Sequence, residues 1–365
     1  MNIAIDMRPT LSRPTGVGVY LLNLVAALSR IDENNQYFLF SSSWKERYPK
    51  TIYGANFQIC DFRWPVRVLN FAWNRLSWPP IESILKRRLD IVHCATPLVI
   101  PARKARKITV AYDLHFLAHP EQTVREIQRD YSGLIRKHCL LSDAVIAISE
   151  YTKQQLIQRL EIPASRIHTI HLAADSYFHE RALAAEIETI RQRLKLDQDY
   201  FLFVGTQEPR KNLPTILKAF AALPPNALMV LAGPEGWQTE PWRSLINERV
   251  RIAGYVSKQE LRALYQNAIA LVMPSLEEGF GLPILEAMAS QTPVIASDIP
   301  VFHEIGGNSF APVDPASVES IATAMRKLQQ EPAERQNLTA KGLKQAEKFS
   351  WNETARKTLE IYRNM

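Results

Sequence analysis

Short apolar runs alternate with helical segments along almost the whole chain, and this alternation constrains the fold more than any other feature. Runs that are apolar throughout are typical of strands buried on both faces. Strands that alternate with helices form parallel sheets covered by helices on both sides, so the sequence predicts an α/β fold. The first such runs are NIAIDM, YFLF, DIVHC, KITVAYD and DAVIAIS. The clearest helix among them, SEYTKQQLIQRL, opens with the expected N-cap Ser149 and is expected to stop at Pro163.

The same pattern starts again after a charged helical segment near residues 181–196. Further strands are predicted in YFLFVG, ALMVLAG, VRIAG, IALVMPS and TPVIAS, and helices in LPTILKAFAAL and SKQELRALYQNA. The chain has more predicted strands than a single sheet would usually contain. We therefore predict two Rossmann-like domains, about 1–175 and 195–345, that face each other across a cleft. Open parallel sheets bind ligands at the carboxyl ends of their strands.

Composition places the chain among globular proteins of a reducing compartment. Of its 365 residues, 46% are hydrophobic and 22% charged, which argues against disorder. No run approaches the roughly 18 apolar residues that span a bilayer, and the start MNIAIDMRPT does not resemble a signal peptide. The widely spaced cysteines suit neither a disulfide framework nor a zinc site, which favours the cytoplasm.

The net charge of +7 lies entirely in the first half of the chain. Residues 1–180 contain 23 Lys+Arg and 16 Asp+Glu, so the second half is neutral overall. A basic half predicts an anionic partner, which could be nucleic acid, a phosphorylated substrate or an acidic membrane surface.

Two glutamates enclose a glycine-containing loop in the segment EEGFGLPILEAM. Pro283 suits the first turn of a helix, so the loop is predicted to lie at a helix N-terminus. That end attracts anions such as a diphosphate, and Gly279 and Gly281 let the backbone approach the bound group. Glu278 and Glu286 would then accept hydrogen bonds from hydroxyl groups on either side of the phosphates. The alternative is an ordinary loop glutamate followed by an exposed glutamate on the helix.

Two other loops follow predicted strands. GTQEPRKN places Arg210 and Lys211 at the end of a strand, where both could bind phosphate, although such a loop could also be a solvated basic turn. RPTGVGVY places Gly16 and Gly18 between the first strand and the first helix. It resembles a dinucleotide-binding loop but lacks the third glycine, so a simple tight turn is the alternative.

Histidines give weaker signals. VAYDLHFLAHP places Tyr112, Asp113 and His115 after a strand, where His115 could donate to a phosphate or a sugar. His93 follows an apolar strand and is more typical of a hydrogen-bonded core histidine. No set of His, Cys, Asp or Glu has convincing metal spacing and no Ser-His-Asp set is evident, so no metal is predicted.

Residues 63–88 interleave aromatic and basic side chains. This mixture suits an anionic lipid surface or single-stranded nucleic acid, and the alternative is a core-packing stretch with a solvated basic face. The residues concerned are Trp64, Trp73, Trp78, Arg63, Arg67, Arg75, Lys86, Arg87 and Arg88.

Taken together, these motifs resemble the family-4 glycosyltransferases, which are retaining enzymes with the GT-B architecture of two facing Rossmann-like domains. Glu278 and Glu286 match the E-x7-E signature of that family, in the loop and helix that carry it. The segments TGVGVYLLNL, SDAVIAISEYTKQQL, FVGTQEPRKN, ALMVLAGPEG, IAGYVSKQELRALYQNA, PSLEEGFGLPILEAMASQTPVIASDIPVFHEIGG and FSWNETARKTLEIYR follow in family order over nearly the whole chain. The amphipathic segment 346–365 could pack on the second domain, but the resemblance implies a helix that crosses back to the first.

The resemblance also implies roles for the matching residues. Glu278 would contact hydroxyl groups of the donor hexose, and Glu286 would hold the ribose of the nucleotide. Lys211, helped by Arg210, would neutralise the leaving diphosphate. The other expected donor-binding positions are the amides of Gly279, Phe280, Gly281 and Leu282, the loop of Gly16, Val17 and Gly18, Thr206, and the base-pocket residues Tyr255 and Val256.

Two positions depart from the family pattern. Tyr112 stands where many members have a histidine before an aspartate, so either Tyr112 or His115 would fill that role. Thr206 stands where many members have an arginine, and Arg210 is expected to supply the second positive charge. The implied mechanism is a front-face, dissociative displacement with retention, in which the leaving phosphate takes the acceptor proton. It implies domain closure and no metal or other cofactor.

We expect a cytoplasmic hexosyltransferase, peripheral at the inner membrane face, that acts in cell-surface polysaccharide or lipopolysaccharide assembly. The expected donor is GDP-mannose, with UDP-glucose or a UDP-N-acetylhexosamine as alternatives. The basic first domain would meet a lipid-linked or saccharide acceptor, with residues 63–88 as a candidate membrane surface. Alternatives are a soluble synthase with a small acceptor, an inactive partner subunit, or a nucleic-acid-binding protein, although no nucleic acid is expected as a partner.

Overall fold

The protein is described by a computed structural model that covers residues 1–11, 16–49, 51 and 53–365. The chain divides into two compact units, one formed by residues 1–172 with 350–365 and the other by residues 173–349. Residues 12–15, which include the start of the predicted glycine-containing turn RPTGVGVY, lie outside the described residues.

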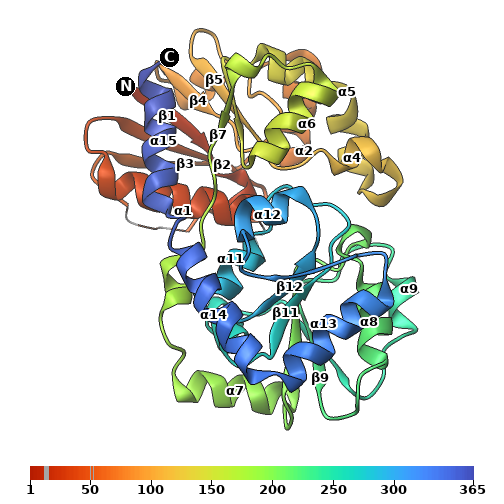
Figure 1. Cartoon of the computed structure of the whole chain (residues 1–365). Helices are drawn as coiled ribbons and strands as arrows, with labels where there is room; N and C mark the ends of the chain where they lie inside the picture. Colours follow the sequence, from red (N-terminus) through yellow and green to blue (C-terminus); the bar gives the residue numbers. More distant parts are fainter. Residues whose placement is uncertain (12–15, 50, 52) are drawn as a thin grey trace. The chain divides into compact units, whose positions relative to one another are not determined.

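The first unit is built on a parallel sheet with the strand order β3-β2-β1-β4-β5-β6-β7 (Figure 1). Its strands are β1 (Asn2–Asp6), β2 (Gln36–Ser42), β3 (Phe57–Phe62), β4 (Ile91–His93), β5 (Arg106–Ala111), β6 (Ala144–Ala147) and β7 (Ile167–Thr169). Ile3 of β1 lies opposite Tyr37 on one side and Ile91 on the other, and all three are buried. The apolar runs therefore form a sheet core, as their composition predicts.

Helices connect these strands. They are α1 (Gly16–Ile31), α2 (Val66–Phe71), α3 (Ile81–Leu85), α4 (His115–Ala118), α5 (Arg125–Leu141) and α6 (Glu150–Leu160), with the short helical turns η1 (Arg8–Thr10), η2 (Ala72–Leu76), η3 (Pro120–Gln122) and η4 (Ala164–Arg166). Ser149 caps α6 as predicted, because its side chain accepts a hydrogen bond from the Thr152 N–H. The helix ends at Leu160, where Glu161 turns into the left-handed region, before Pro163 is reached.

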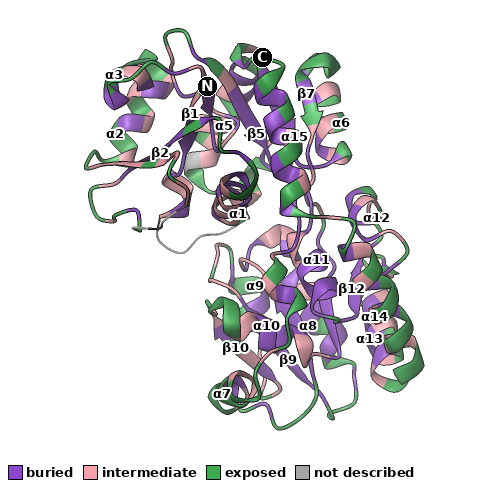
Figure 2. Ribbon diagram, turned by 90° about the vertical axis from the view of Figure 1, so that its left-hand side faces the viewer, coloured by how far each residue is buried: buried purple, intermediate pink, exposed green. Residues whose placement is uncertain are grey.

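The second unit repeats the design with the strand order β10-β9-β8-β11-β12-β13, again with parallel neighbours. Its strands are β8 (Tyr200–Val204), β9 (Leu228–Ala232), β10 (Val250–Gly254), β11 (Ala270–Met273), β12 (Val294–Ser297) and β13 (Ala311–Val313). Its helices are α7 (Ala184–Leu194), α8 (Leu213–Ala221), α9 (Glu240–Arg243), α10 (Lys258–Gln266), α11 (Leu282–Ala289), α12 (Pro300–Gly306), α13 (Val318–Gln330) and α14 (Pro332–Ala346), with the turns η5 (Ser176–His179) and η6 (Pro209–Lys211). The four central strands β8, β9, β11 and β12 are buried throughout, whereas the edge strands β10 and β13 are only partly buried. Figure 2 shows exposed outer faces on the helices of this unit.

The last helix, α15 (Trp351–Arg363), belongs to the first unit and packs against α1. It places Tyr362 in the core, where the Tyr362 hydroxyl lies 2.7 Å from Nδ1 of His93. The Tyr20 hydroxyl lies 3.2 Å from the other ring nitrogen of His93. Burial lowers the pKa of His93 to about 4, so the ring is neutral at physiological pH. His93 is therefore a hydrogen-bonded core histidine, as its apolar setting predicts.

No helix within the described residues combines the length and the apolar character that a membrane crossing requires.

Removing one hydroxyl group should test how α15 is held in the first unit. Tyr362→Phe keeps the ring but leaves Nδ1 of buried His93 without its partner, so we expect a loss of about 1–3 kcal/mol in the free energy of unfolding. Urea unfolding followed by circular dichroism measures this. Arg356→Ala, which breaks only exposed ion pairs on α15, is the control and should leave the urea midpoint close to that of wild type. Equal effects of the two substitutions would contradict the role given to Tyr362.

Candidate functional site

The loops that follow neighbouring strands of the second unit are tied together at the carboxyl edge of its sheet. The N–H of Gln207, after β8, donates to the Pro234 carbonyl after β9 at 3.1 Å. The N–H of Gly233 donates to the Gly254 carbonyl, at the end of β10, at 2.8 Å. Thr206 follows β8, and Tyr255 and Val256 follow β10. All three therefore lie at the carboxyl edge, where parallel sheets bind ligands.

A buried ion cluster forms where the loop after β8 meets the loop after β11. Glu278 accepts a hydrogen bond from Nη1 of Arg210 at 2.6 Å and another from Nζ of Lys211. Nε of Arg210 also forms an ion pair with Glu208 at 2.6 Å. Lys211 is only 7% exposed and Glu278 only 5%. Lys211 is therefore not part of a solvated turn, and Glu278 is a buried, ion-paired carboxylate.

The charge state of Glu278 follows from this cluster. Burial alone would raise the pKa of Glu278, but the charges of Arg210 and Lys211 outweigh burial and lower it to about 2. Glu278 is therefore ionised at neutral pH. An ammonium group has three N–H donors, so Lys211 can bind Glu278 and an anionic ligand at the same time.

Asn212 connects the loop after β8 to the loops after β11 and β13 through side-chain hydrogen bonds. Its backbone is in the left-handed region (φ 61°), and its Nδ2 donates to the carbonyls of Pro274 at 3.1 Å and Pro315 at 2.7 Å. Sequence reasoning missed both Asn212 and Glu208 as parts of the site. The available signal was an asparagine directly before a helix, because this residue type tolerates the left-handed conformation.

The predicted helix after the glycine-containing loop is α11, which begins at Leu282 with Pro283 in its first turn. Gly281 precedes it with φ 93°, and a Cβ there would lie 2.7 Å from a ring carbon of Phe302. Only glycine suits this position, because other residues would be strained and would clash with the Phe302 ring. The loop residues Gly279 and Phe280 lead directly into this turn.

Glu286 lies one turn into α11 and is buried, so the alternative of an exposed helical glutamate is also wrong. It accepts a hydrogen bond from the Tyr265 hydroxyl at 3.0 Å. Burial raises the pKa of Glu286 to about 7 despite this hydrogen bond. Tyr265, from α10, was missed in the sequence because its apolar neighbours indicate only a core residue. The two glutamates of the signature thus have pKa values displaced in opposite directions.

The remaining predicted residues belong to the first unit. Gly16, Val17 and Gly18 form the first turn of α1. The Tyr112 hydroxyl donates to the Ala95 carbonyl at 3.0 Å, so this donor is already engaged in the structure. His115 is buried at the start of α4, just after β5, with its ring 5.0 Å from the ring of His119.

Residues 63–88 do not form one amphipathic helix. They form α2, η2 and α3, and Trp73 is buried in the core with the Arg8 guanidinium 4.7 Å from its ring centroid. Trp64 and Trp78 are exposed. The segment therefore contributes to the core through Trp73 and also carries aromatic side chains on the surface.

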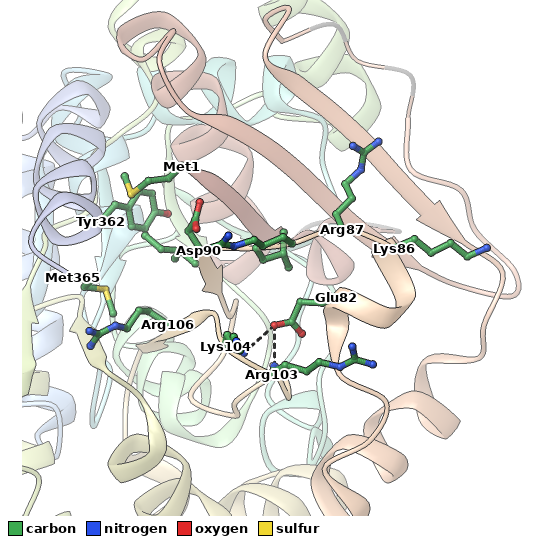
Figure 3. A pocket seen from close by; sticks show the side chains of 13 residues that line it. Met1, Glu82, Lys86, Arg87, Asp90, Arg103, Lys104, Arg106, Tyr362 and Met365 are labelled. Carbon is green, nitrogen blue, oxygen red and sulfur yellow. Dashed lines mark hydrogen bonds between the residues drawn. The ribbon is translucent and has the colours of Figure 1, made fainter.

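A basic pocket of about 870 Å³ lies at the opposite, amino-terminal edge of the first sheet. Figure 3 shows that the side chains of Lys86, Arg87 and Arg103 point away from Asp90 and Tyr362. Because its cations do not converge, this pocket is not a good candidate for an anion site.

Comparisons with known proteins identify the class of the chain. Residues 14–176 match the family described as Glycosyltransferase Family 4, and residues 186–345 match Glycosyl transferases group 1. The solved structure of sucrose-phosphate synthase from Thermosynechococcus elongatus covers 100% of this chain and 98% of its own, with a TM-score of 0.80 and 19% identity. The protein is thus a glycosyltransferase with the GT-B fold. It belongs to the glycosyltransferases that join a family-4 domain to a group-1 domain, which confirms the resemblance seen in the sequence.

Two curated relatives are similar over much of the chain. The O-antigen chain mannosyltransferase B of Escherichia coli is 28% identical over 382 aligned positions and covers 100% of both chains. An O-antigen chain mannosyltransferase of Salmonella typhimurium is 28% identical over 272 positions, 73% of each chain.

The raised pKa of Glu286 should make stability depend on pH. Below about pH 4.5 the carboxyl group is protonated whether the protein is folded or unfolded. Between about pH 4.5 and 7 the folded state keeps a proton that the unfolded state releases, so stability falls as pH rises to 7 and stays lower above it. The amide of Glu286→Gln does not titrate, so this variant should gain up to about 3 kcal/mol relative to wild type over that window.

Melting temperatures of the nucleotide-free protein, measured at pH 4.5, 6 and 8, check this prediction. Glu248→Gln, at an exposed position of the same unit, is the matched control and should follow the wild type at each pH. A difference between Glu286→Gln and wild type that stays constant with pH would contradict it.

Proposed function

We propose that the enzyme transfers mannose from GDP-mannose, with retention of configuration, to a lipid-linked saccharide in cell-surface glycan assembly. The observation that carries the reaction class is the buried Glu278 cluster with Arg210 and Lys211, placed beside the N-terminus of α11. Two relatives are named O-antigen chain mannosyltransferases, one matched over its full length and one over 73% of it. Their names support mannose as the sugar and cell-surface glycan assembly as the pathway.

In this proposal the second unit binds the donor. The diphosphate lies at the N-terminus of α11, against the amides of residues 279–282 and the Lys211 ammonium group. Glu278 accepts hydrogen bonds from the hexose hydroxyls, and Glu286 accepts them from the ribose. Thr206, Tyr255 and Val256, on the same edge, surround the nucleotide base and its sugar.

The chemistry follows from where charge develops. As the bond between the anomeric carbon and the diphosphate breaks, negative charge grows on the leaving phosphate oxygen. Lys211, Arg210 and the α11 dipole stabilise that charge, and no divalent metal is needed for this purpose. The leaving phosphate accepts the acceptor hydroxyl proton, and the acceptor oxygen bonds to the anomeric carbon on the same face.

A thermal-shift screen with GDP, UDP, ADP, CMP and their sugars, in EDTA, tests the donor. A nucleotide at about a hundred times its dissociation constant adds roughly 2.7 kcal/mol and raises the melting temperature by a few degrees. GDP and GDP-mannose are expected to do so, followed by mannose transfer. A shift with UDP alone would replace the donor by a UDP-sugar and keep the site. No shift with any nucleotide would contradict the proposal.

Loss of the Lys211 ammonium group should slow turnover strongly. Lys211→Ala removes positive charge opposite the leaving diphosphate, so we expect kcat to fall by about 10²-fold or more. Initial rates with a radiolabelled sugar donor measure this, and Lys218→Ala, an exposed lysine of α8, is the control. Near-normal turnover in Lys211→Ala would overturn the role of this residue.

We further propose that the enzyme works at the cytoplasmic face of an anionic membrane, through the surface of residues 63–88. Large apolar side chains are exposed there beside arginines: Val68 and Phe71 are each 63% exposed, and Leu76 is 64% exposed. Exposed apolar groups combined with cations bind the interface of anionic bilayers.

Inserting charge into this surface should weaken membrane binding. The double variant Val68→Asp with Leu76→Asp is expected to sediment at least about tenfold less with phosphatidylglycerol vesicles than wild type, since each substitution replaces apolar area with a carboxylate. Leu183→Asp, at an equally exposed leucine of the second unit, should sediment as wild type does. Equal sedimentation of the double variant and wild type would exclude this surface.

A further inference from the structure

A second pocket of the first unit, here called the arginine pocket, is lined by guanidinium and carboxamide groups. It has a volume of about 490 Å³. Its polar lining includes Arg67, Asn70, Asn74, Arg75, Arg125 and Arg129. These residues come from α2, η2 and α5, so two segments far apart in the sequence build one site.

The spacing of these residues brings their side chains together. Arg67, Asn70 and Asn74 are three and four positions apart, and Arg125 and Arg129 are four apart, so each set shares one helix face. The segment of α2 follows β3, and α5 follows the loop after β5. The arginine pocket therefore lies on the carboxyl side of the first sheet, as do Gly16 and His115, and not on the side of the pocket in Figure 3.

The arginine pocket is positively charged. Its one lining carboxylate, Asp130, is bound by Arg129 through two hydrogen bonds of 2.7 Å. Arg67 and Arg125 form no ion pair with any part of the chain that the structure describes. Arg75 also lies close enough to Asp130 to help lower the pKa of that carboxyl group. The described lining therefore has four arginines against one carboxylate.

A hydrogen bond from Arg8 orients the side chain of Asn70. Nη1 of Arg8 donates to Oδ1 of Asn70 at 2.7 Å, and Arg8 is itself fixed by Asp6 and by Trp73. Because the amide oxygen of Asn70 is occupied, the amide offers its N–H donors to a ligand. Guanidinium and amide N–H groups donate hydrogen bonds, and phosphate oxygens accept them.

We propose that the arginine pocket binds the phosphate or diphosphate group of the acceptor. This inference rests on the proposed transfer to a lipid-linked saccharide, and it names the group that links lipid and sugar. The exposed Val68, Phe71 and Leu76 lie on the same segment as Arg67 and Asn74 and would contact the lipid. The phosphate of a bilayer headgroup has the same chemistry, but a concave pocket built from two helices suits a single bound group better than a flat membrane surface.

The binding of inorganic pyrophosphate tests the pocket directly. Calorimetric titration compares wild type with Arg67→Ala/Arg125→Ala and with the control Arg103→Ala/Arg159→Ala, which also removes two exposed arginines of the first unit. We expect the first variant to lose one pyrophosphate site, or to bind it at least about tenfold more weakly, and the control to match wild type. Any pyrophosphate bound near Lys211 is present in all three proteins. Equal pyrophosphate binding by all three proteins, or equal weakening in both variants, would contradict the assignment of a phosphate site to this pocket.

Acceptor kinetics identify the source of the phosphate. Without vesicles, the same saccharide is offered on a short prenyl diphosphate and on an uncharged alkyl chain. Wild type and the control should have a KM at least about tenfold lower for the diphosphate acceptor, and Arg67→Ala/Arg125→Ala should lose this preference. If the variant keeps the preference but no longer binds phosphatidylglycerol vesicles, a membrane headgroup occupies the pocket and the acceptor assignment is wrong.

These measurements separate the inference from the proposed function. Absence of transfer from every nucleotide sugar to either acceptor would overturn the proposed function. The pyrophosphate titration would still decide whether the arginine pocket binds phosphate.

Discussion

The loops at the carboxyl edge of the second sheet depend on one interaction, the neutralisation of a buried carboxylate by two cations from another loop. Burying an ionised group without a partner costs several kcal/mol. Arg210 and Lys211 offset that cost for Glu278, and Asn212 fixes the loop that carries them. The cluster holds Lys211 in one place before any ligand is bound, which is the preorganisation that electrostatic catalysis requires.

The second signature glutamate lies in a contrasting environment. Glu278 is buried against two cations and keeps its charge, whereas Glu286 is buried against a phenol and has a pKa of about 7. In the sequence, the N-terminus of α11 therefore lies between a carboxylate that is ionised at neutral pH and a carboxyl group that titrates near neutrality. The two carboxyl groups have the same chemistry and differ only in their partners, and nothing in the nine-residue motif distinguishes them.

The sequence predicted strands, helices and caps correctly where the residues that determine them lie close together in the chain. The apolar runs at Ile3 and Leu271 are buried strands, Ser149 caps α6, and Pro283 marks the first turn of α11. The family resemblance pointed to Glu278, Glu286 and Lys211 as one set. It did not predict Glu208, Asn212 or Tyr265, because their roles depend on residues that lie beside them only after folding. The segment of residues 63–88 was also ambiguous, since Trp73 is buried and Trp78 exposed within a similar composition.

The sequence by itself determined the strand and helix pattern and the helix caps, because periodicity and capping act between residues a few positions apart. It indicated the class of enzyme through the resemblance of its motifs to family-4 glycosyltransferases. The tertiary structure alone decided which charges meet. Lys211 and Glu278 are 67 positions apart, and only the adjacency of β8 and β11 in the sheet brings their loops together. The same holds for the arginine pocket, whose two arginine-bearing segments meet through the packing of helices that no local pattern records.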